Sequence, residues 1–108
     1  MKPFVILPLL MTLMLAACSN HYLRSENEQT HLFLKIRHAQ SVMFASSLDH
    51  FQWRNTDRIN GQTWQITIPR DIPQTYIYLV DDQIFLPDCR FKEQDDFGSE
   101  NCLYIPGM

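Results

Sequence analysis

Alternation of apolar and polar residues is the pattern that most restricts the fold of this chain. It is clearest in the segment TWQITIP, residues 63–69, where Trp64, Ile66 and Ile68 share one face of an extended chain. A period of two places successive side chains on opposite faces of a strand. The segment LFLKIR, residues 32–37, alternates in the same way except at one phenylalanine. Both segments are therefore predicted to be half-buried strands of an antiparallel sheet.

Turn residues mark two hairpins in the second half of the chain. Asn60-Gly61 predicts a two-residue turn, because both residues tolerate positive φ, so a strand is expected just before it, near residues 51–58. Residues 75–87 predict a second hairpin that turns at residues 81–83. Apolar residues on both faces of its first strand favour a central position in the sheet. A short last strand is expected at residues 102–106.

Residues 40–53 carry two competing patterns. Their apolar residues recur at helical spacing, yet Val42 and Phe44 also alternate as in a strand. The interpretation adopted is a strand near residues 41–45 followed by a loop. Because the rest of the chain shows little convincing helix, we predict an all-β fold with roughly six to seven short strands, in a small antiparallel β-sandwich or a partly open barrel.

The first residues have the layout of an export signal. Lys2 supplies a positive charge, residues 4–15 form an apolar run, and two small residues, Ala16 and Ala17, follow it. A membrane-spanning helix needs roughly 20 apolar residues, so this run is too short for a regular span. The alternative interpretation is a buried core helix.

The segment LAAC, from Leu15 through Ala16 and Ala17 to Cys18, resembles the lipobox of bacterial lipoproteins. The resemblance implies that residues 1–17 are a lipoprotein signal peptide, that cleavage occurs before Cys18, and that Cys18 receives the lipid. Two or more acyl chains anchor a protein stably, whereas one does so only marginally. In lipoproteins the residue after the lipidated cysteine influences which membrane retains the protein. Ser19 implies the periplasmic face of the outer membrane of a Gram-negative bacterium.

The chain behind this cysteine divides into two parts. Residues 18–30 are almost free of apolar residues and are predicted to be a lipid anchor with a flexible polar tether. Residues 31–108 suffice for one small β-domain. His21 and His31 have no partner at metal-binding spacing, so we interpret them as solvated histidines.

The charge balance is modestly acidic. The chain has twelve acidic and nine basic residues, and removal of Lys2 with the signal leaves a net charge of about −4. A nucleic-acid binder would normally show a basic patch or stripe, which this balance does not suit. The chain also offers no polybasic surface for anionic lipid. The predicted contact with the membrane is therefore the lipid on Cys18, and no cofactor is predicted.

Two cysteines remain once Cys18 is assigned to lipid. Export to an oxidising compartment favours a disulfide between Cys89 and Cys102. In the chain-entropy model such a bridge stabilises the fold by on the order of 3 kcal/mol. The alternatives are a metal site, which would want further ligands at close spacing, and a redox pair, which is more typically C-x-x-C.

The segment between these cysteines, residues 90–101, is the richest candidate for a site. A calcium-binding loop would place a ligand where Phe97 stands and a glutamate where Tyr104 stands, so no metal site is predicted. The favoured interpretation is a solvated acidic loop with Phe91 and Phe97 turned inward, and the alternative is a loop that contacts a protein partner. The candidate partner-binding residues are Glu93, Asp95, Asp96 and Glu100.

No catalytic motif emerges from the sequence. Ser46, Ser47, Asp49 and His50 are close along the chain, but their spacing establishes no geometry. The protein is therefore predicted not to be an enzyme. An aromatic cluster could form an exposed binding patch, although aromatic residues in alternating strands usually belong to the core. Its members are Phe51, Trp53, Trp64, Tyr76 and Tyr78.

Two classes of function remain for a lipid-anchored β-domain. The first is a non-catalytic accessory or assembly factor of an envelope complex, as pilotins and the sandwich-type lipoproteins of type VI secretion are. The second is a periplasmic inhibitor or immunity protein that neutralises a toxin or a lysozyme, with an acidic loop that would steer a cationic target. Beyond the lipobox, no family motif is matched in the chain.

Overall fold

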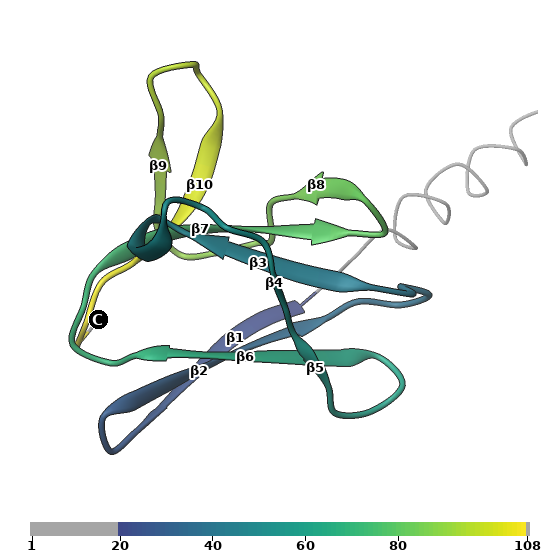
Figure 1. Cartoon of the computed structure of the whole chain (residues 1–108). Helices are drawn as coiled ribbons and strands as arrows, with labels where there is room; N and C mark the ends of the chain where they lie inside the picture. Colours follow the sequence, from purple (N-terminus) through teal and green to yellow (C-terminus); the bar gives the residue numbers. More distant parts are fainter. Residues whose placement is uncertain (1–19, 108) are drawn as a thin grey trace, which may run out of the picture.

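A computed structural model describes residues 20–107 of the chain, and it shows two sheets packed face to face (Figure 1). The predicted signal peptide, the lipobox with Cys18, and Ser19 lie outside the described residues. The strands are β1 (Asn20–Glu26), β2 (Gln29–Lys35), β3 (Val42–Ser46), β4 (Arg54–Asn55), β5 (Asp57–Arg58), β6 (Thr63–Pro69), β7 (Gln74–Val80), β8 (Gln83–Phe85), β9 (Lys92–Gln94) and β10 (Glu100–Tyr104), with a short 3₁₀ turn, η2 (Ser47–Asp49), after β3.

Every strand pair in the described part of the chain is antiparallel. One sheet has the order β1-β2-β6-β5 and the other the order β4-β3-β7-β10-β9, with β8 beside the second half of β7. The predicted small all-β fold of antiparallel sheets is confirmed, and the sheets are not closed into a barrel. The strands are more numerous than predicted, and four of them, β4, β5, β8 and β9, have only two or three residues.

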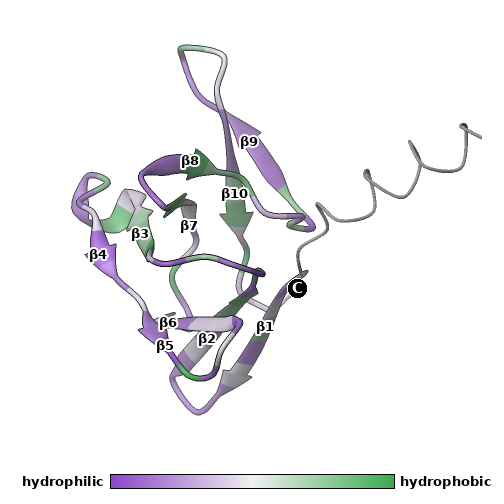
Figure 2. Ribbon diagram, turned by 90° about the vertical axis from the view of Figure 1, so that its right-hand side faces the viewer, coloured by the Kyte–Doolittle hydropathy of each residue, from purple (hydrophilic) through white to green (hydrophobic). Residues whose placement is uncertain are grey.

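The core lies between the two sheets and follows the predicted alternation. Leu32 and Leu34 of β2 and Ile68 of β6 turn inward and are completely or almost completely buried. They belong to one cluster with aromatic side chains of the other sheet, among them Phe44 and Tyr78. In Figure 2 the central strands β7 and β10 are largely hydrophobic, whereas β4, β5 and β9 at the periphery are hydrophilic.

The first strand corrects the predicted tether. From Asn20 onward the chain is not flexible but forms β1, a seven-residue strand paired along its whole length with β2. The strand was missed because its inward positions are partly polar. His21 and Ser25 find partners inside the fold, in the hydroxyl groups of Tyr78 and Thr30 respectively.

The turn residues explain why one predicted hairpin has the expected turn and another does not. The hairpin of β7 and β8 turns at Asp81 and Asp82, whose φ angles of 48° and 67° suit a tight turn, as predicted. The hairpin of β5 and β6 also forms, but neither Asn60 nor Gly61 has positive φ. Instead the Asn60 Oδ1 accepts bonds from the backbone N–H groups of Gln62 and Thr63, so the side chain rather than the backbone conformation shapes this loop.

Two further strand predictions agree with the structure, and one agrees only in part. The ambiguous segment is a strand, β3, followed by η2 and a loop, and the last strand is β10. The strand expected before Asn60 is present only as the short pieces β4 and β5, which belong to different sheets. No helix within residues 20–107 is long and apolar enough to cross a membrane.

Candidate functional site

A disulfide joins Cys89 to Cys102, as predicted, with their Cα atoms 5.9 Å apart. Cys102 lies on β10 and is completely buried, while Cys89 lies in the segment that leads from β8 to β9. The bridge therefore fixes the base of the β9–β10 hairpin to the body of the sandwich. Beyond that base the hairpin extends past the other strands of the sandwich, at the top of Figure 1.

The turn of this hairpin is held by Asp95. Its Oδ1 accepts bonds from the backbone N–H groups of Phe97 and Ser99, both at 2.9 Å. The Asp95 N–H donates to the Ser99 carbonyl, and Gly98 takes a positive φ of 86° that suits glycine. Asp95 is thus a structural residue of the turn.

The other predicted acids, Glu93, Asp96 and Glu100, are exposed on the same hairpin. None of them forms an ion pair with any residue in the range 20–107. Phe97 at the tip is 93% exposed, so the expectation that it turns inward is wrong. Phe91, at the base, is half-buried. The hairpin therefore presents an exposed aromatic side chain at its tip and three exposed carboxylates along its length.

A pocket of about 110 Å³ opens beside the base of the hairpin, between β1 and β10. No sequence pattern pointed to it, because its walls come from four separate segments. Arg90 is the only charged residue among them. The lining residues are Leu23, Tyr76, Cys89, Arg90, Phe91, Leu103, Tyr104 and Ile105.

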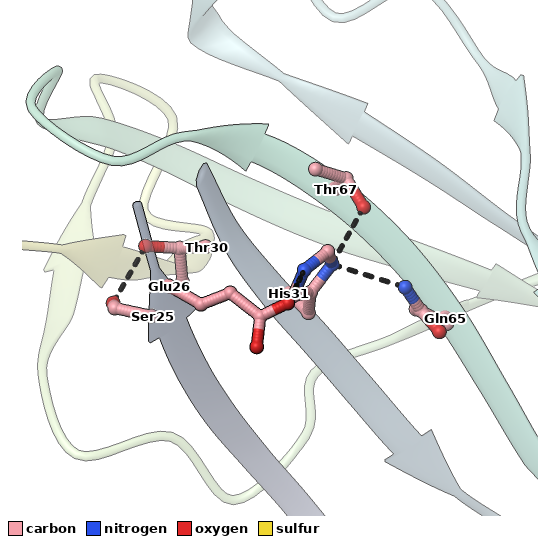
Figure 3. Close-up of polar contacts among 6 residues, drawn as sticks. All are labelled: Ser25, Glu26, Thr30, His31, Gln65 and Thr67. Atoms are coloured by element: carbon pink, nitrogen blue, oxygen red, sulfur yellow. Dashed lines mark hydrogen bonds and ion pairs between the residues drawn. The ribbon is translucent and has the colours of Figure 1, made fainter. Parts of the chain in front are cut away.

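A polar cluster lies on the outer face of the first sheet (Figure 3). The His31 Nδ1 accepts bonds from the Gln65 amide at 3.0 Å and the Thr67 hydroxyl at 2.9 Å, so its Nε2 carries the proton that faces Glu26 at 3.6 Å. The order hydroxyl, imidazole and carboxylate is that of a catalytic triad. However, none of these side chains lines the pocket, and the Gln65 amide competes for the same nitrogen. The contacts of this cluster therefore join the neighbouring strands β1, β2 and β6, which is a structural role.

His21 is not solvated as predicted but is mostly buried beside Tyr76 and Tyr78. Its Nε2 lies 3.0 Å from the Tyr78 hydroxyl, and its Nδ1 has no partner among the described residues. Burial lowers the pKa of His21 to about 4, because the charged imidazole would lose its hydration. Burial also raises the pKa of both tyrosines above their ordinary range.

The four residues considered for catalysis have structural roles. The Ser46 hydroxyl donates to Gln74 Oε1 at 2.6 Å, and the Ser47 hydroxyl accepts from the backbone N–H of Thr75. Asp49 accepts from the backbone N–H of Gln52 and faces the Arg54 guanidinium at 3.6 Å. His50 takes a left-handed backbone conformation at the end of η2.

The predicted aromatic cluster is divided between the core and the surface. Trp64, Tyr76 and Tyr78 are buried, as the core interpretation requires. Phe51 and Trp53 are each 40% exposed in the loop after η2, so for these two the core interpretation is wrong. Phe51 also has a φ of 59°, which is unusual for a bulky residue.

Within residues 20–107 no three His, Cys, Asp or Glu side chains gather closely enough to hold a metal ion. The candidate surfaces are therefore the projecting acidic hairpin and the apolar pocket with the strand edge beside it. Comparison with known protein families and with curated proteins found no match for this chain.

Proposed function

We propose that this protein is a lipid-anchored envelope lipoprotein that binds a protein partner without catalysis, as an accessory or assembly factor of an envelope complex. The lipobox resemblance at Leu15 to Cys18 supports the anchor, and Ser19 supports the periplasmic face of the outer membrane. Contact with the membrane would be made through the lipid on Cys18.

The observation that carries the binding role is the β9–β10 hairpin. Its base is fixed by the disulfide and its turn by Asp95, so little conformational freedom is lost when a partner binds. It exposes Phe97 almost completely, and aromatic residues seated in a partner's pocket commonly supply much of the binding energy at an interface. A rigid hairpin with an aromatic tip is suited to insertion into a cleft.

The acids of the hairpin favour a second candidate function. Glu93, Asp96 and Glu100 are exposed on the hairpin and form no ion pair within the described residues. Such a surface accelerates association with a cationic protein, and the effect weakens as salt rises. This observation supports a periplasmic inhibitor or immunity protein that neutralises a toxin or a lysozyme.

Affinity capture distinguishes the two candidates. The acylated protein is extracted in mild detergent and captured at low and at high salt, and the co-purified proteins are identified by mass spectrometry. Envelope-complex subunits that persist at high salt and are lost in Phe97→Ser would support the assembly role. A hydrolase or toxin that is lost at high salt, or when Glu93, Asp96 and Glu100 are neutralised, would support the inhibitor role.

Matched variants make this test specific. Ile84 is a second exposed apolar side chain, 66% exposed on β8 away from the hairpin tip, so Ile84→Ser controls for the loss of surface hydrophobicity. Asp82→Asn controls for the loss of an exposed charge. If capture falls equally in the Phe97 and Ile84 variants, the hairpin is not the binding surface. Processing of Cys18→Ser to the mature length would overturn the lipid anchor.

A further inference from the structure

The edges of the two sheets are protected very unequally. On one side of the sandwich the edge strands β4 and β5 have only two residues each. On the other side the edge strand of the second sheet, β9, has three residues, whereas that of the first sheet, β1, has seven and contains no proline. Within the described part of the chain β1 pairs only with β2. Short strands and prolines are the usual protection against further strand pairing. β1 has neither.

The hydrogen-bond pattern identifies which backbone groups of β1 are free. Arg70 N–H donates to the Glu28 carbonyl and Ile36 N–H to the Gln62 carbonyl, so the even-numbered residues of β2 bond to β6. Bonding alternates along an antiparallel strand, so the odd-numbered residues of β2 bond to β1. In the β1–β2 register the odd-numbered residues of β2 lie opposite the even-numbered residues of β1, which therefore bond to β2. The N–H and C=O groups of the remaining residues, His21, Leu23 and Ser25, point to the free edge.

The apolar pocket begins at the middle of this edge. Leu23, the central residue of the three, also lines the pocket, together with Leu103 and Ile105 among others. A pocket of 110 Å³ is somewhat smaller than the apolar cavity of about 150 Å³ that holds benzene in another protein. It therefore has the size for one aliphatic side chain.

The positive charge of Arg90 determines which charged group of a ligand would be favoured at the pocket. It is the only charged lining residue, it is exposed, and it forms no ion pair with another residue of the range 20–107. Its guanidinium lies 5.2 Å from the centre of the Phe91 ring, at the rim of the pocket. A carboxylate is the complementary group, because guanidinium binds carboxylate in a bidentate manner.

We propose that the free edge of β1 and the adjoining pocket bind an extended segment of a partner protein, which adds to the first sheet as a further strand. One aliphatic side chain of that segment enters the pocket, and a neighbouring Asp or Glu pairs with Arg90. Main-chain bonds supply affinity and the pocket supplies side-chain selectivity. This surface is separate from the tip of the acidic hairpin, so the inference goes beyond the function proposed above.

The register can be tested without any partner. Amide hydrogen exchange of the full chain, measured by NMR, should find the N–H groups of His21, Leu23 and Ser25 fast and those of Tyr22 and Arg24 slow. The opposite pattern would overturn the assignment of the free edge.

Binding is tested with random peptides of about nine residues, a length that covers a strand of this size. The peptides are selected on the full-length protein in detergent micelles, and the dissociation constants of enriched peptides are then measured. Enrichment of an aliphatic residue next to an acid supports the proposal. Enrichment of no peptide, or of peptides that bind equally well after Leu23→Asp, overturns it.

Paired variants locate the contacts. Ser25→Pro removes the outward N–H without breaking a main-chain bond to β2, and Ser25→Ala removes the same hydroxyl but keeps the N–H. Peptide binding should therefore weaken about tenfold in the first variant and stay unchanged in the second. Arg90→Gln should weaken binding of the acidic peptides while Arg90→Lys retains part of it. Equal peptide affinity in the two Ser25 variants would overturn the proposed strand pairing. A dimer of this chain that dissociates in Ser25→Pro would show that a second copy, rather than a partner protein, occupies the edge.

Discussion

The two long sides of the sandwich are closed in different ways. On the β4–β5 side the chain itself passes from one sheet to the other at Thr56, whose N–H and hydroxyl both donate to the Val42 carbonyl. On the β1–β10 side no such crossing occurs in the part of the chain that the structure describes. That side is held by individual links between residues far apart in sequence, such as Thr30 and Tyr104, which are separated by 74 positions.

This difference suggests that the side whose residues matter most for stability is also the side that carries the proposed binding surface. A crossing chain keeps two sheets together whatever its side chains are, whereas a set of separate links can be broken one at a time. The β1–β10 side is therefore expected to be the more sensitive to substitution, and it also carries the pocket and the free edge. The following predictions test that expectation.

The largest effect is expected from the disulfide. The double variant Cys89→Ala/Cys102→Ala should lower the free energy of unfolding by about 3 kcal/mol, because the unfolded chain is no longer constrained. Denaturant unfolding of the oxidised protein and of the double variant measures the difference, with the reduced native protein as the control. An unchanged midpoint would mean that the β1–β10 side does not depend on the bridge.

The next effect is a pH dependence caused by His21. Its pKa is about 4 in the folded protein and 6.5 when unperturbed, so the unfolded chain binds more protons between these values. The stabilising contribution is therefore complete above pH 6.5 and is lost as the pH falls towards 4. The total loss is on the order of 3 kcal/mol, at 1.36 kcal/mol for each pKa unit.

A comparison variant isolates this contribution from that of the carboxylates. His21→Gln retains a group that can bond to the Tyr78 hydroxyl but does not titrate. Unfolding free energies measured between pH 7 and pH 4 should fall less steeply in His21→Gln than in the native protein. Parallel pH profiles would show that His21 is hydrated in the folded state.

A smaller effect is expected at Tyr104. Its hydroxyl donates to the Arg70 carbonyl at 2.6 Å, so Thr30 must donate to Tyr104, and Ser25 to Thr30. Tyr104→Phe removes both bonds of this hydroxyl, to the buried Thr30 and to the Arg70 carbonyl, and should cost about 1–3 kcal/mol. A double-mutant cycle with Thr30→Val should show coupling between the two sites. Additive losses would contradict the hydroxyl chain.

The smallest effect is expected on the opposite side. Thr56→Val removes the hydroxyl bond to Val42 but keeps the backbone bond, so the loss should be about 1 kcal/mol or less. The measurement is the same denaturant unfolding. If Thr56→Val destabilises the protein as much as Tyr104→Phe, the two sides do not differ as we describe.

The sequence predicted the strands whose inward residues are apolar. β6 was predicted with its bounds, and β3, β7 and β10 close to theirs, because alternation and turn residues are local signals. β1 was not predicted, since its inward residues His21 and Ser25 are acceptable in the fold only through partners contributed by distant strands. The polar pattern of β1 is therefore not a local signal of a strand.

The candidate site, like the strands, was predicted only where the sequence carries a local signal. The disulfide followed from the number of cysteines and the expected export, and the exposed acids between its cysteines followed from composition. The exposure of Phe97 did not follow, because an apolar residue in a loop usually turns inward unless the loop projects beyond the body of the protein. The pocket had no sequence signal, since Leu23, Arg90 and Ile105 come together only through the packing of β1 against the end of the chain.

The early start of β1 changes how an anchored protein of this kind would move. The strand begins at Asn20, so Ser19 alone would separate a lipid on Cys18 from the folded body. A chain extends by about 3.5 Å per residue, so such a connection spans less than about 10 Å. The domain would rest close to the bilayer, and its encounters would follow lateral diffusion in the plane of the membrane. Partners embedded in that membrane, or brought to its surface, would then be favoured over proteins that diffuse freely in the periplasm.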